Sequence, residues 1–171
     1  MAPSVRGKAE VETNEALLDA LVQTSFTVIG IVSAVAAKHD LSLTLLRVGA
    51  ILRDRTLTMS ELAAYLGLDR STITGLINRA SERHLVRRVG NENDKRSSRV
   101  TLTEAGQALA TTCASEISRK IAPLVARLTP VERDRLTKLL ALALDEGTAH
   151  LPADENHLRP ENALYRTAPS A

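Results

Sequence analysis

The sequence predicts a mainly α-helical protein with one small β-hairpin, and three observations lead to this fold class. Apolar residues make up 44% of the 171 residues but aromatic residues only 2%, so the core must be aliphatic, which favours helices. Apolar residues recur at helical spacing in several segments. Residues 88–103 instead alternate at both ends around a polar middle, as a hairpin does.

Two helices are expected after a flexible arm at residues 1–12. Apolar residues three or four positions apart predict a long helix over 14–38, which Asp40 and Leu41 interrupt. A second apolar stripe predicts a helix that ends near residue 55.

A short helix, a tight turn and a second helix are expected next. Residues 58–61 (TMSE) have a capping-box pattern, and Gly67 suits a left-handed helix stop. Asp69 is a good N-cap for the following helix, which runs from 70 to about 84 with one apolar face. This order is that of a helix-turn-helix.

A basic hairpin follows, with strands at 86–90 and 98–102, and completes a winged helix-turn-helix. Residues 70–99 hold eight basic and three acidic side chains, a net charge of +5, whereas the remainder holds 14 basic and 17 acidic ones, a net charge of −3. A positive field confined to one region is typical of a site for a polyanion. A solvated charged surface is the alternative.

Two long helices are expected after the hairpin. The first covers about 103–128 with a kink at Pro123, and the second begins at a capping box with Thr129 and ends near Gly147. Residues 148–171 have little periodicity and are expected to form an extension.

The exposed face of the helix at 70–84 carries small and polar residues that suit the DNA major groove. Arginine can bind guanine O6 and N7, and asparagine can pair with adenine N6 and N7. Hydroxyl groups and the helix N-terminus suit phosphate oxygens. The candidate DNA contacts in the helix-turn-helix are Ser60, Arg70, Ser71, Thr72, Thr74, Gly75, Asn78 and Arg79.

These segments resemble the multiple antibiotic resistance regulator (MarR) family of bacterial transcription factors. The resemblance rests on LTMSELAAYLGLDRSTITGLINRASERHLVRR at 57–88 and on NDKRSSRVTLTEAG at 93–106. Its most specific element is the Asp-x-Arg of Asp94 and Arg96, followed by LT-x-x-G at 102–106.

Two residues depart from the family pattern. His84 replaces the usual glycine after the recognition helix, so the left-handed turn there forms less easily. Ala80 replaces a common leucine. We therefore expect a slightly altered wing position and an unchanged fold.

The resemblance implies roles for residues of the wing. Asp94 would hold the wing loop, Arg96 would reach the minor groove or its phosphates, and Arg88 would anchor the base of the wing. The candidate DNA contacts in the wing are Arg88, Asp94, Lys95, Arg96, Ser97 and Arg99.

The resemblance also implies a homodimer that binds a palindromic DNA operator, most often as a repressor, with release by a small aromatic or phenolic effector. The winged helix would occupy 57–103, between dimerisation regions at 13–56 and 104–147. Apolar stripes broader than one winged helix can cover favour a dimer independently. His39 and Arg47 lie near the junction where relatives bind ligands, and are the candidate effector contacts.

Other classes of protein have less support. The single cysteine, Cys113, excludes an internal disulfide, and a cysteine redox-sensing regulator remains an alternative. The four histidines lack the spacing of a helical ligand pair, so no metal and no cofactor is expected. No nucleophile–base pair or phosphate-binding glycine loop is present, which argues against an enzyme. A helical protein–protein adaptor that keeps a winged helix without binding DNA is a further alternative.

We find no apolar run of transmembrane length and no signal peptide. The sequence therefore predicts a cytoplasmic bacterial protein that associates with the nucleoid and has no membrane partner.

Overall fold

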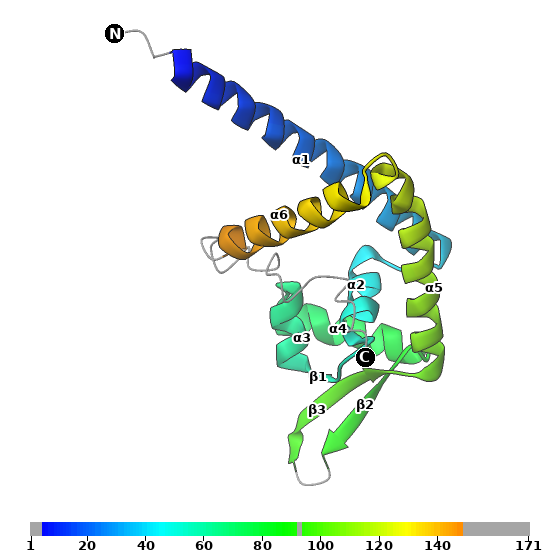
Figure 1. Cartoon of the computed structure of the whole chain (residues 1–171). Coiled ribbons are helices and arrows are strands. Elements are labelled where there is room, and N and C mark those ends of the chain that lie inside the picture. Colours follow the sequence, from blue (N-terminus) through cyan, green and yellow to red (C-terminus); the bar gives the residue numbers. More distant parts are fainter. Residues whose placement is uncertain (1–4, 92–93, 149–171) are drawn as a thin grey trace.

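The computed structural model describes the backbone of residues 5–91 and 94–148 and the side chains of residues 14–90 and 98–144 (Figure 1). The described elements are α1 (Val5–Lys38), α2 (Leu43–Leu52), β1 (Leu57–Thr58), α3 (Met59–Leu66), α4 (Arg70–Glu82), β2 (Val86–Asn91), β3 (Asp94–Leu102), α5 (Glu104–Ile121), the 3-10 helix η1 (Ala122–Val125) and α6 (Pro130–Thr148). The predicted fold class, mainly helical with a hairpin, is confirmed.

The elements form two regions that α5 connects. Figure 1 shows α1 and α6 diverging from the far end of α5, whereas α2, α3, α4 and the strands gather at its other end. The hairpin of β2 and β3 projects beyond these helices. The arrangement separates an open pair of long helices from a winged helix-turn-helix.

The winged helix has its own aliphatic core, built from α2, α3, α4 and the strands. Burial of each such side chain contributes about 1.5–3 kcal/mol, so this core holds α4 firmly against the rest of the region. Its buried members are Val48, Ile51, Leu52, Leu57, Leu62, Leu66, Ile73, Leu76, Ile77, Ala80, Val86 and Val100.

A three-stranded antiparallel sheet with the order β1-β3-β2 holds the wing. Leu57 pairs with Val100, which also lies opposite Arg88 of β2. Strand β1 was not predicted from the sequence, and both hairpin strands extend further toward the tip than predicted. A strand of two residues is too short to produce the alternation by which strands are found.

A second, smaller core joins α1, α2 and α5 around Cys113, which is 3% exposed. Burial raises the pKa of the Cys113 thiol, and the charge of Glu116 raises it further. A buried thiol with a raised pKa is a poor nucleophile, so these surroundings favour a packing role over redox sensing.

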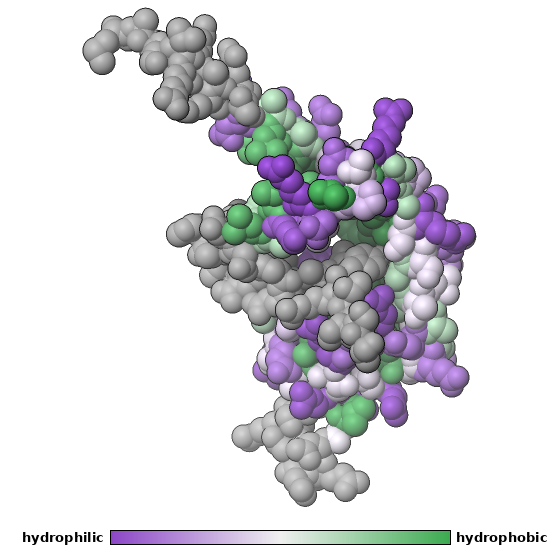
Figure 2. All heavy atoms as spheres, in the orientation of Figure 1, coloured by the Kyte–Doolittle hydropathy of each residue, from purple (hydrophilic) through white to green (hydrophobic). Residues whose placement is uncertain are grey.

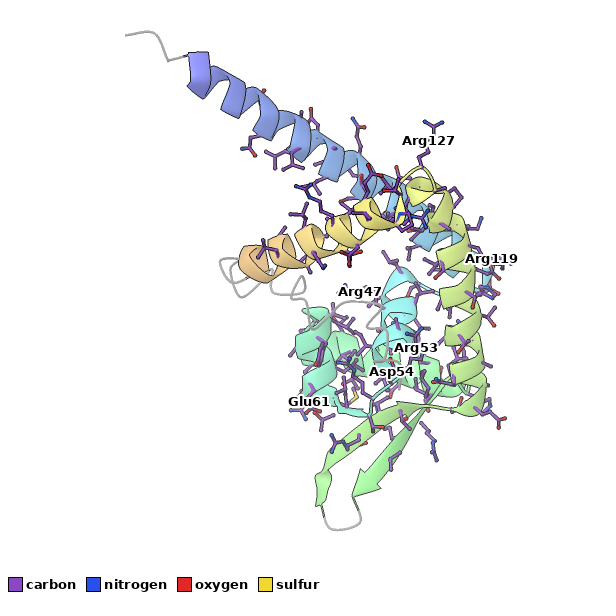
Figure 3. The ribbon with its side chains drawn as sticks, in the orientation of Figure 1. Arg47, Arg53, Asp54, Glu61, Arg119 and Arg127 are labelled. Atoms are coloured by element: carbon purple, nitrogen blue, oxygen red, sulfur yellow. The ribbon has the colours of Figure 1, made fainter. Side chains whose placement is uncertain are left out.

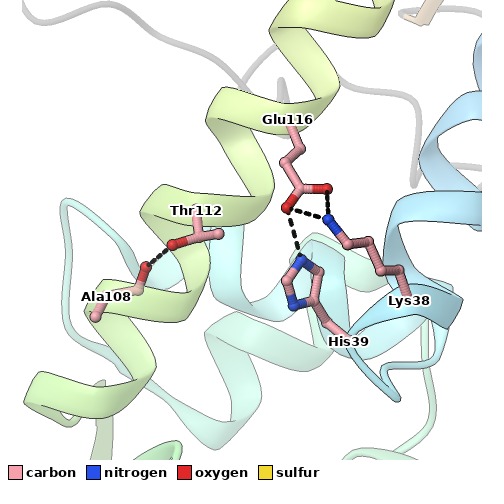
Figure 4. A network of polar contacts seen from close by, with 5 residues as sticks. All are labelled: Lys38, His39, Ala108, Thr112 and Glu116. Atoms are coloured by element: carbon pink, nitrogen blue, oxygen red, sulfur yellow. Dashed lines mark hydrogen bonds and ion pairs between the residues drawn. The ribbon is translucent and has the colours of Figure 1, made fainter.

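The buried carboxylate of Glu116 links two helices of this core, α5 and the C-terminal end of α1 (Figure 4). Glu116 of α5 accepts hydrogen bonds from Lys38 Nζ at 2.8 and 2.9 Å, and its Oε1 lies 3.2 Å from His39 Nε2. The bonds from Lys38, with a smaller contribution from His39, hold the pKa of Glu116 below its ordinary value of 4.5. The network fixes the end of α1 against α5.

Because the pKa of Glu116 is lowered in the folded protein, its contribution to stability is present above about pH 4.5 and is lost as the pH falls further. We expect Glu116→Gln to reduce the loss of unfolding free energy between pH 7 and pH 3, measured by urea denaturation. Glu104→Gln, a change at an exposed glutamate of the same helix, is the control and should keep the wild-type pH dependence. If the unfolding free energies of both variants depended on pH in the same way, the contribution assigned to Glu116 would be contradicted.

Several predicted boundaries were wrong. Helix α1 begins at Val5, within the predicted arm, because Lys8, Ala9 and Glu10 are good helix formers and the segment Val5–Lys38 contains no proline. Pro123 does not kink a longer helix: α5 ends at Ile121, and η1 follows. This agrees with the loss of a backbone donor and the steric clash that proline introduces.

At the C-terminal end, Gly147 does not stop α6, which is described as far as Thr148. The predicted capping box at the start of α6 is confirmed, since Thr129 and Glu132 exchange backbone hydrogen bonds at 2.8 and 3.3 Å. The extension predicted at 148–171 lies outside the described residues after Thr148.

His84 adopts the left-handed conformation that a glycine would favour, with φ of 55°. Its carbonyl accepts a hydrogen bond from Thr103 Oγ1 at 2.6 Å, and its N–H donates to Ser81 O at 2.9 Å. The family turn after α4 therefore forms, and these bonds offset the backbone strain.

We expect His84→Gly to raise the free energy of unfolding by about 1 kcal/mol, because a residue with a Cβ costs roughly 1–2 kcal/mol in this conformation. Urea denaturation at one protein concentration measures the change. His84→Ala keeps the Cβ and should give no such gain; equal stabilisation by alanine and glycine would contradict the strain.

The expectation that no apolar run reaches transmembrane length is wrong. Residues Asn14–Lys38 form a stretch of 25 residues that contains an 18-residue window with a mean hydropathy of 1.8, so it is long and apolar enough to cross a bilayer. Scattered Gly, Ser, Thr and Gln residues interrupt the apolar run but lower its mean hydropathy only a little. Long helices in the cores of soluble proteins meet the same criteria, so length and composition do not establish a membrane span.

Candidate nucleic-acid interface

The helix-turn-helix is built by local caps that the sequence encodes. Thr58 and Glu61 form the predicted capping box of α3, with Thr58 N–H donating to Glu61 Oε2 at 2.7 Å. Gly67 ends α3 with φ of 65°, and Asp69 caps α4. These caps fix the short turn between the helices and so the direction in which α4 points.

Asp69 occupies the backbone donors at the start of α4. Its Oδ1 accepts from the N–H groups of Ser71 and Thr72 at 2.8 and 2.9 Å. Hydrogen bonds from the hydroxyls of Ser71 and Thr72 hold the pKa of Asp69 well below its usual range, so the cap is anionic. The expectation that this helix N-terminus receives a phosphate is therefore not supported for the free protein.

The hydroxyl groups along α4 are also committed. Ser71 and Thr72 donate to the two oxygens of Asp69, and Thr74 Oγ1 donates to Arg70 O at 2.6 Å. A hydroxyl has one proton to donate, so these groups can still accept a hydrogen bond but cannot donate to a phosphate without first breaking a bond. The proposed phosphate contacts are better served by the arginines.

The exposed face of α4 presents two arginines and an asparagine. Arg70, Asn78 and Arg79 are exposed, whereas Ile73 and Ile77 on the opposite face are fully buried. A Cβ at Gly75 would lie 3.5 Å from Arg79 Nη1, so the Arg79 side chain folds back along the helix over this position. The predicted division of α4 into a buried and a polar face is confirmed.

Asn78 and Arg88 contact one another across α4 and β2. Arg88 Nη2 donates to Asn78 Oδ1 at 2.7 Å, and both side chains are exposed. Both residues are candidate DNA contacts from the sequence, but their mutual contact could not be predicted because they come from different elements.

The remaining candidate contacts are less fully described. Ser60 is exposed near the start of α3, and Arg99 of β3 is exposed and donates to Thr56 O at 3.3 Å. The other predicted wing contacts lie outside the residues whose side chains are described: Asp94, Lys95, Arg96 and Ser97.

Arg83, at the C-terminal end of α4, connects the recognition helix to the long helices. Its guanidinium donates to Asp40 O at 2.6 Å and to His39 O at 3.4 Å, both in the turn between α1 and α2. From the sequence, Arg83 was predicted to contribute only to the positive charge of residues 70–99. These two bonds join the C-terminal end of α4 to the turn that follows α1.

An apolar pocket lies between α2, α5 and the base of the wing. Arg53, which follows the last residue of α2 and is labelled in Figure 3, is the one cationic side chain among its lining residues. The predicted effector contacts, His39 and Arg47, do not line it: His39 faces Glu116, and Arg47 is half-buried with a pKa lowered by burial. The pocket is lined by Leu41, Leu45, Leu46, Val48, Gly49, Ala50, Arg53, Leu85, Val86, Leu102, Gly106, Leu109, Ala110, Cys113, Ala114 and Ile117.

No group of three or more His, Cys, Asp or Glu side chains that could hold a metal ion occurs within the described part of the chain. The polar groups of the interface are instead arginines, an asparagine and hydroxyls, which are the usual partners of nucleic acid.

A capped helix pair followed by a three-stranded sheet with a projecting hairpin defines a winged helix-turn-helix protein. A model of the MarR family matches residues 44–97, which include both helices of this motif. Over these residues the chain is similar to the MarR family, and solved structures of that family have the same fold. No curated protein sequence matches the chain.

Three solved structures are similar over most of their length. RV1404 from Mycobacterium tuberculosis is 21% identical with a TM-score of 0.67, covering 86% of this chain and 97% of its own. MarR from E. coli in its apo form is 25% identical with a TM-score of 0.62, covering 74% and 96%. NadR in complex with 4-hydroxyphenylacetate is 23% identical with a TM-score of 0.61, covering 71% and 87%.

Proposed function

We propose that this protein is a sequence-specific transcriptional regulator that binds a palindromic DNA operator as a homodimer. The observation that carries the proposal is the exposed face of α4, where Arg70, Asn78 and Arg79 stand next to Arg88 of the wing strand. Arginine and asparagine are the side chains that read purine edges in the major groove. The wing, with Arg88 and Arg99, would lie along the adjacent backbone.

The dimer rests on apolar surface that the single chain leaves uncovered. Figure 2 shows apolar side chains on the described part of α1 and on α6. Phe26 is 71% exposed and Val131 77% exposed, and a soluble monomer rarely leaves so many large apolar side chains in contact with water. The exposed apolar residues of the two helices are Leu17, Leu18, Leu21, Val22, Phe26, Ile29, Val131, Leu136, Leu139, Leu140, Leu142 and Leu144.

A twofold dimer of this kind would present two α4 helices to successive major grooves, about one helical turn apart. The residues from 13–56 and 104–147 would then form the dimerisation region, and 57–103 the DNA-binding region. A repressor that blocks its own operator is the usual form of such a regulator.

A small-molecule effector is part of the proposal. NadR was solved in complex with 4-hydroxyphenylacetate, an aromatic carboxylate, and the apolar pocket beside α5 combines an aliphatic lining with one arginine. An aromatic ring would bury against the leucines while a carboxylate reached Arg53. His39 and Arg47 stay as predicted effector contacts in the dimer.

The decisive test is selection of bound duplexes from a random-sequence DNA library, followed by affinity measurements on the enriched sequence. We expect a near-palindrome, and we expect Arg79→Ala to weaken its binding about tenfold or more, because a good base contact is worth about 1–3 kcal/mol. Arg119→Ala on the outer side of α5, remote from α4 in Figure 3, is the charge-matched control and should bind almost normally. Arg96→Ala tests the wing contact implied by the family.

The main competing proposal is a helical protein–protein adaptor that has kept a winged helix. This adaptor would enrich no duplex from the library, and its binding to nucleic acid would be unchanged in Arg79→Ala and in Arg96→Ala. A cytoplasmic location follows from the regulator proposal, and cell fractionation with a DNase step would test association with the nucleoid.

A further inference from the structure

The contact between Arg88 and Asn78 fixes the orientation of the Asn78 amide, which is the only amide side chain of α4. A guanidinium carries N–H donors and no acceptor, so the group facing Arg88 must be the amide oxygen of Asn78. The distance of 2.7 Å is that of a charge-assisted hydrogen bond. The Nδ2 amino group of Asn78 therefore points away from the Arg88 guanidinium.

This orientation changes what Asn78 can recognise. An asparagine pairs with adenine by accepting a hydrogen bond from the N6 amino group and donating one to N7. Here one of the two lone pairs of the accepting oxygen is already taken by a cationic donor. The positive charge of Arg88 makes this oxygen a weaker acceptor for a second donor and disfavours the partial positive charge of an adenine amino group beside it. What the pair offers instead is donors, from Asn78 Nδ2 and from the guanidinium.

Guanine is the purine whose major-groove edge carries two acceptors, O6 and N7, and no donor. We propose that Arg88 acts as a specificity-determining residue that converts Asn78 from an adenine reader into a guanine reader. This inference rests on the proposed function, and it corrects the adenine pairing expected from the sequence. Arg88 is in this view a positioning residue for Asn78 as well as an anchor of the wing.

The test is the same duplex selection, performed in parallel on the wild type, Asn78→Ala, Arg88→Ala and Arg88→Met. Methionine keeps much of the aliphatic length of arginine while removing its donors. The base pair read by Asn78 is identified as the position that loses its preference in Asn78→Ala. Arg87→Ala removes the same charge from the next residue of β2, whose side chain points to the other face of the sheet.

We expect guanine at the Asn78 position in the wild type. The ratio of guanine to adenine there should fall about fivefold or more in both Arg88 variants, the size of a lost bidentate base contact. In Arg87→Ala this ratio should hold within about twofold, because the substitution removes a charge of the same strand without touching Asn78. Thermal melting of each variant checks that the exposed substitutions leave the fold intact.

Three results would overturn the inference while leaving DNA binding in place: adenine at the Asn78 position in the wild type, an unchanged guanine ratio in the Arg88 variants, or no altered position in Asn78→Ala. A wild type that enriches no duplex would instead overturn the proposed function, and the inference with it. The two failures are therefore distinguishable in one experiment.

Discussion

Replacing Gly106 with alanine is expected to lower the free energy of unfolding by about 3 kcal/mol, near the upper end of the usual cost of overpacking. Gly106 is buried near the start of α5, and a Cβ there would lie 1.9 Å from Leu85 O and 2.9 Å from Leu85 C. Because both contacts are to backbone, no side-chain rotation can relieve them. Urea denaturation at a fixed protein concentration measures the loss.

The added methyl group would clash with the backbone of Leu85, at the base of the wing. Leu85 O accepts a hydrogen bond from Thr103 N–H at 3.1 Å, and Thr103 in turn caps α5 through Gly106 N–H at 3.0 Å. Any shift that makes room for the methyl group breaks this junction between β2 and α5. We therefore expect the variant to lose operator binding as well as stability.

Gly49→Ala is the matched control, since a Cβ there would meet Ala110 Cβ at an ordinary 3.7 Å. Alanine is favoured over glycine within a helix by about 0.5–1 kcal/mol, so this variant should be as stable as the wild type or more so. Equal stabilities of the Gly106 and Gly49 variants would show that the junction is not closely packed.

Replacing Leu139 with aspartate is expected to convert the proposed dimer into monomers and to weaken operator binding about 100-fold, because a single half-site loses the advantage of two linked contacts. Leu139 is 53% exposed on α6, and burial of a carboxylate in an apolar interface is strongly unfavourable. Analytical ultracentrifugation at micromolar concentration measures the change in mass.

The control for this variant lies on the polar side of the same helix. Lys138 pairs with Asp134 at 2.8 Å and is exposed to solvent. Lys138→Ala should remain a dimer with nearly normal affinity. A wild type that sediments as a monomer and still binds a palindrome tightly would contradict the proposed use of α1 and α6.

The local signals in the sequence predicted most of the fold. The capping boxes at Thr58 and Thr129 and the N-cap at Asp69 involve residues at most three apart, and all three are confirmed. The glycine of LT-x-x-G, selected by resemblance to the family, has a physical reason in the approach of Gly106 to Leu85.

What the sequence could not supply are contacts between elements. The bond from Arg88 to Asn78 and that from Arg83 to Asp40 join residues 10 and 43 positions apart, and depend on how α4 packs. The lining of the pocket also depends on contacts between elements that are distant in the sequence. Arg53 lines the pocket, whereas His39 and Arg47, which were predicted as effector contacts, do not. The exposed polar face of α4 was predictable from the sequence, but the hydrogen bonds that its side chains make were not.

The most direct test of the account is the stoichiometry and specificity of the complex with the selected duplex. Sedimentation of the protein with a labelled palindrome should give two chains per duplex. Affinity for the palindrome should exceed that for a scrambled duplex of equal composition by about 1000-fold near physiological salt, at the lower end for specific regulators. One chain per duplex, or equal affinity for both sequences, would contradict the claim that this protein is a dimeric, sequence-specific regulator.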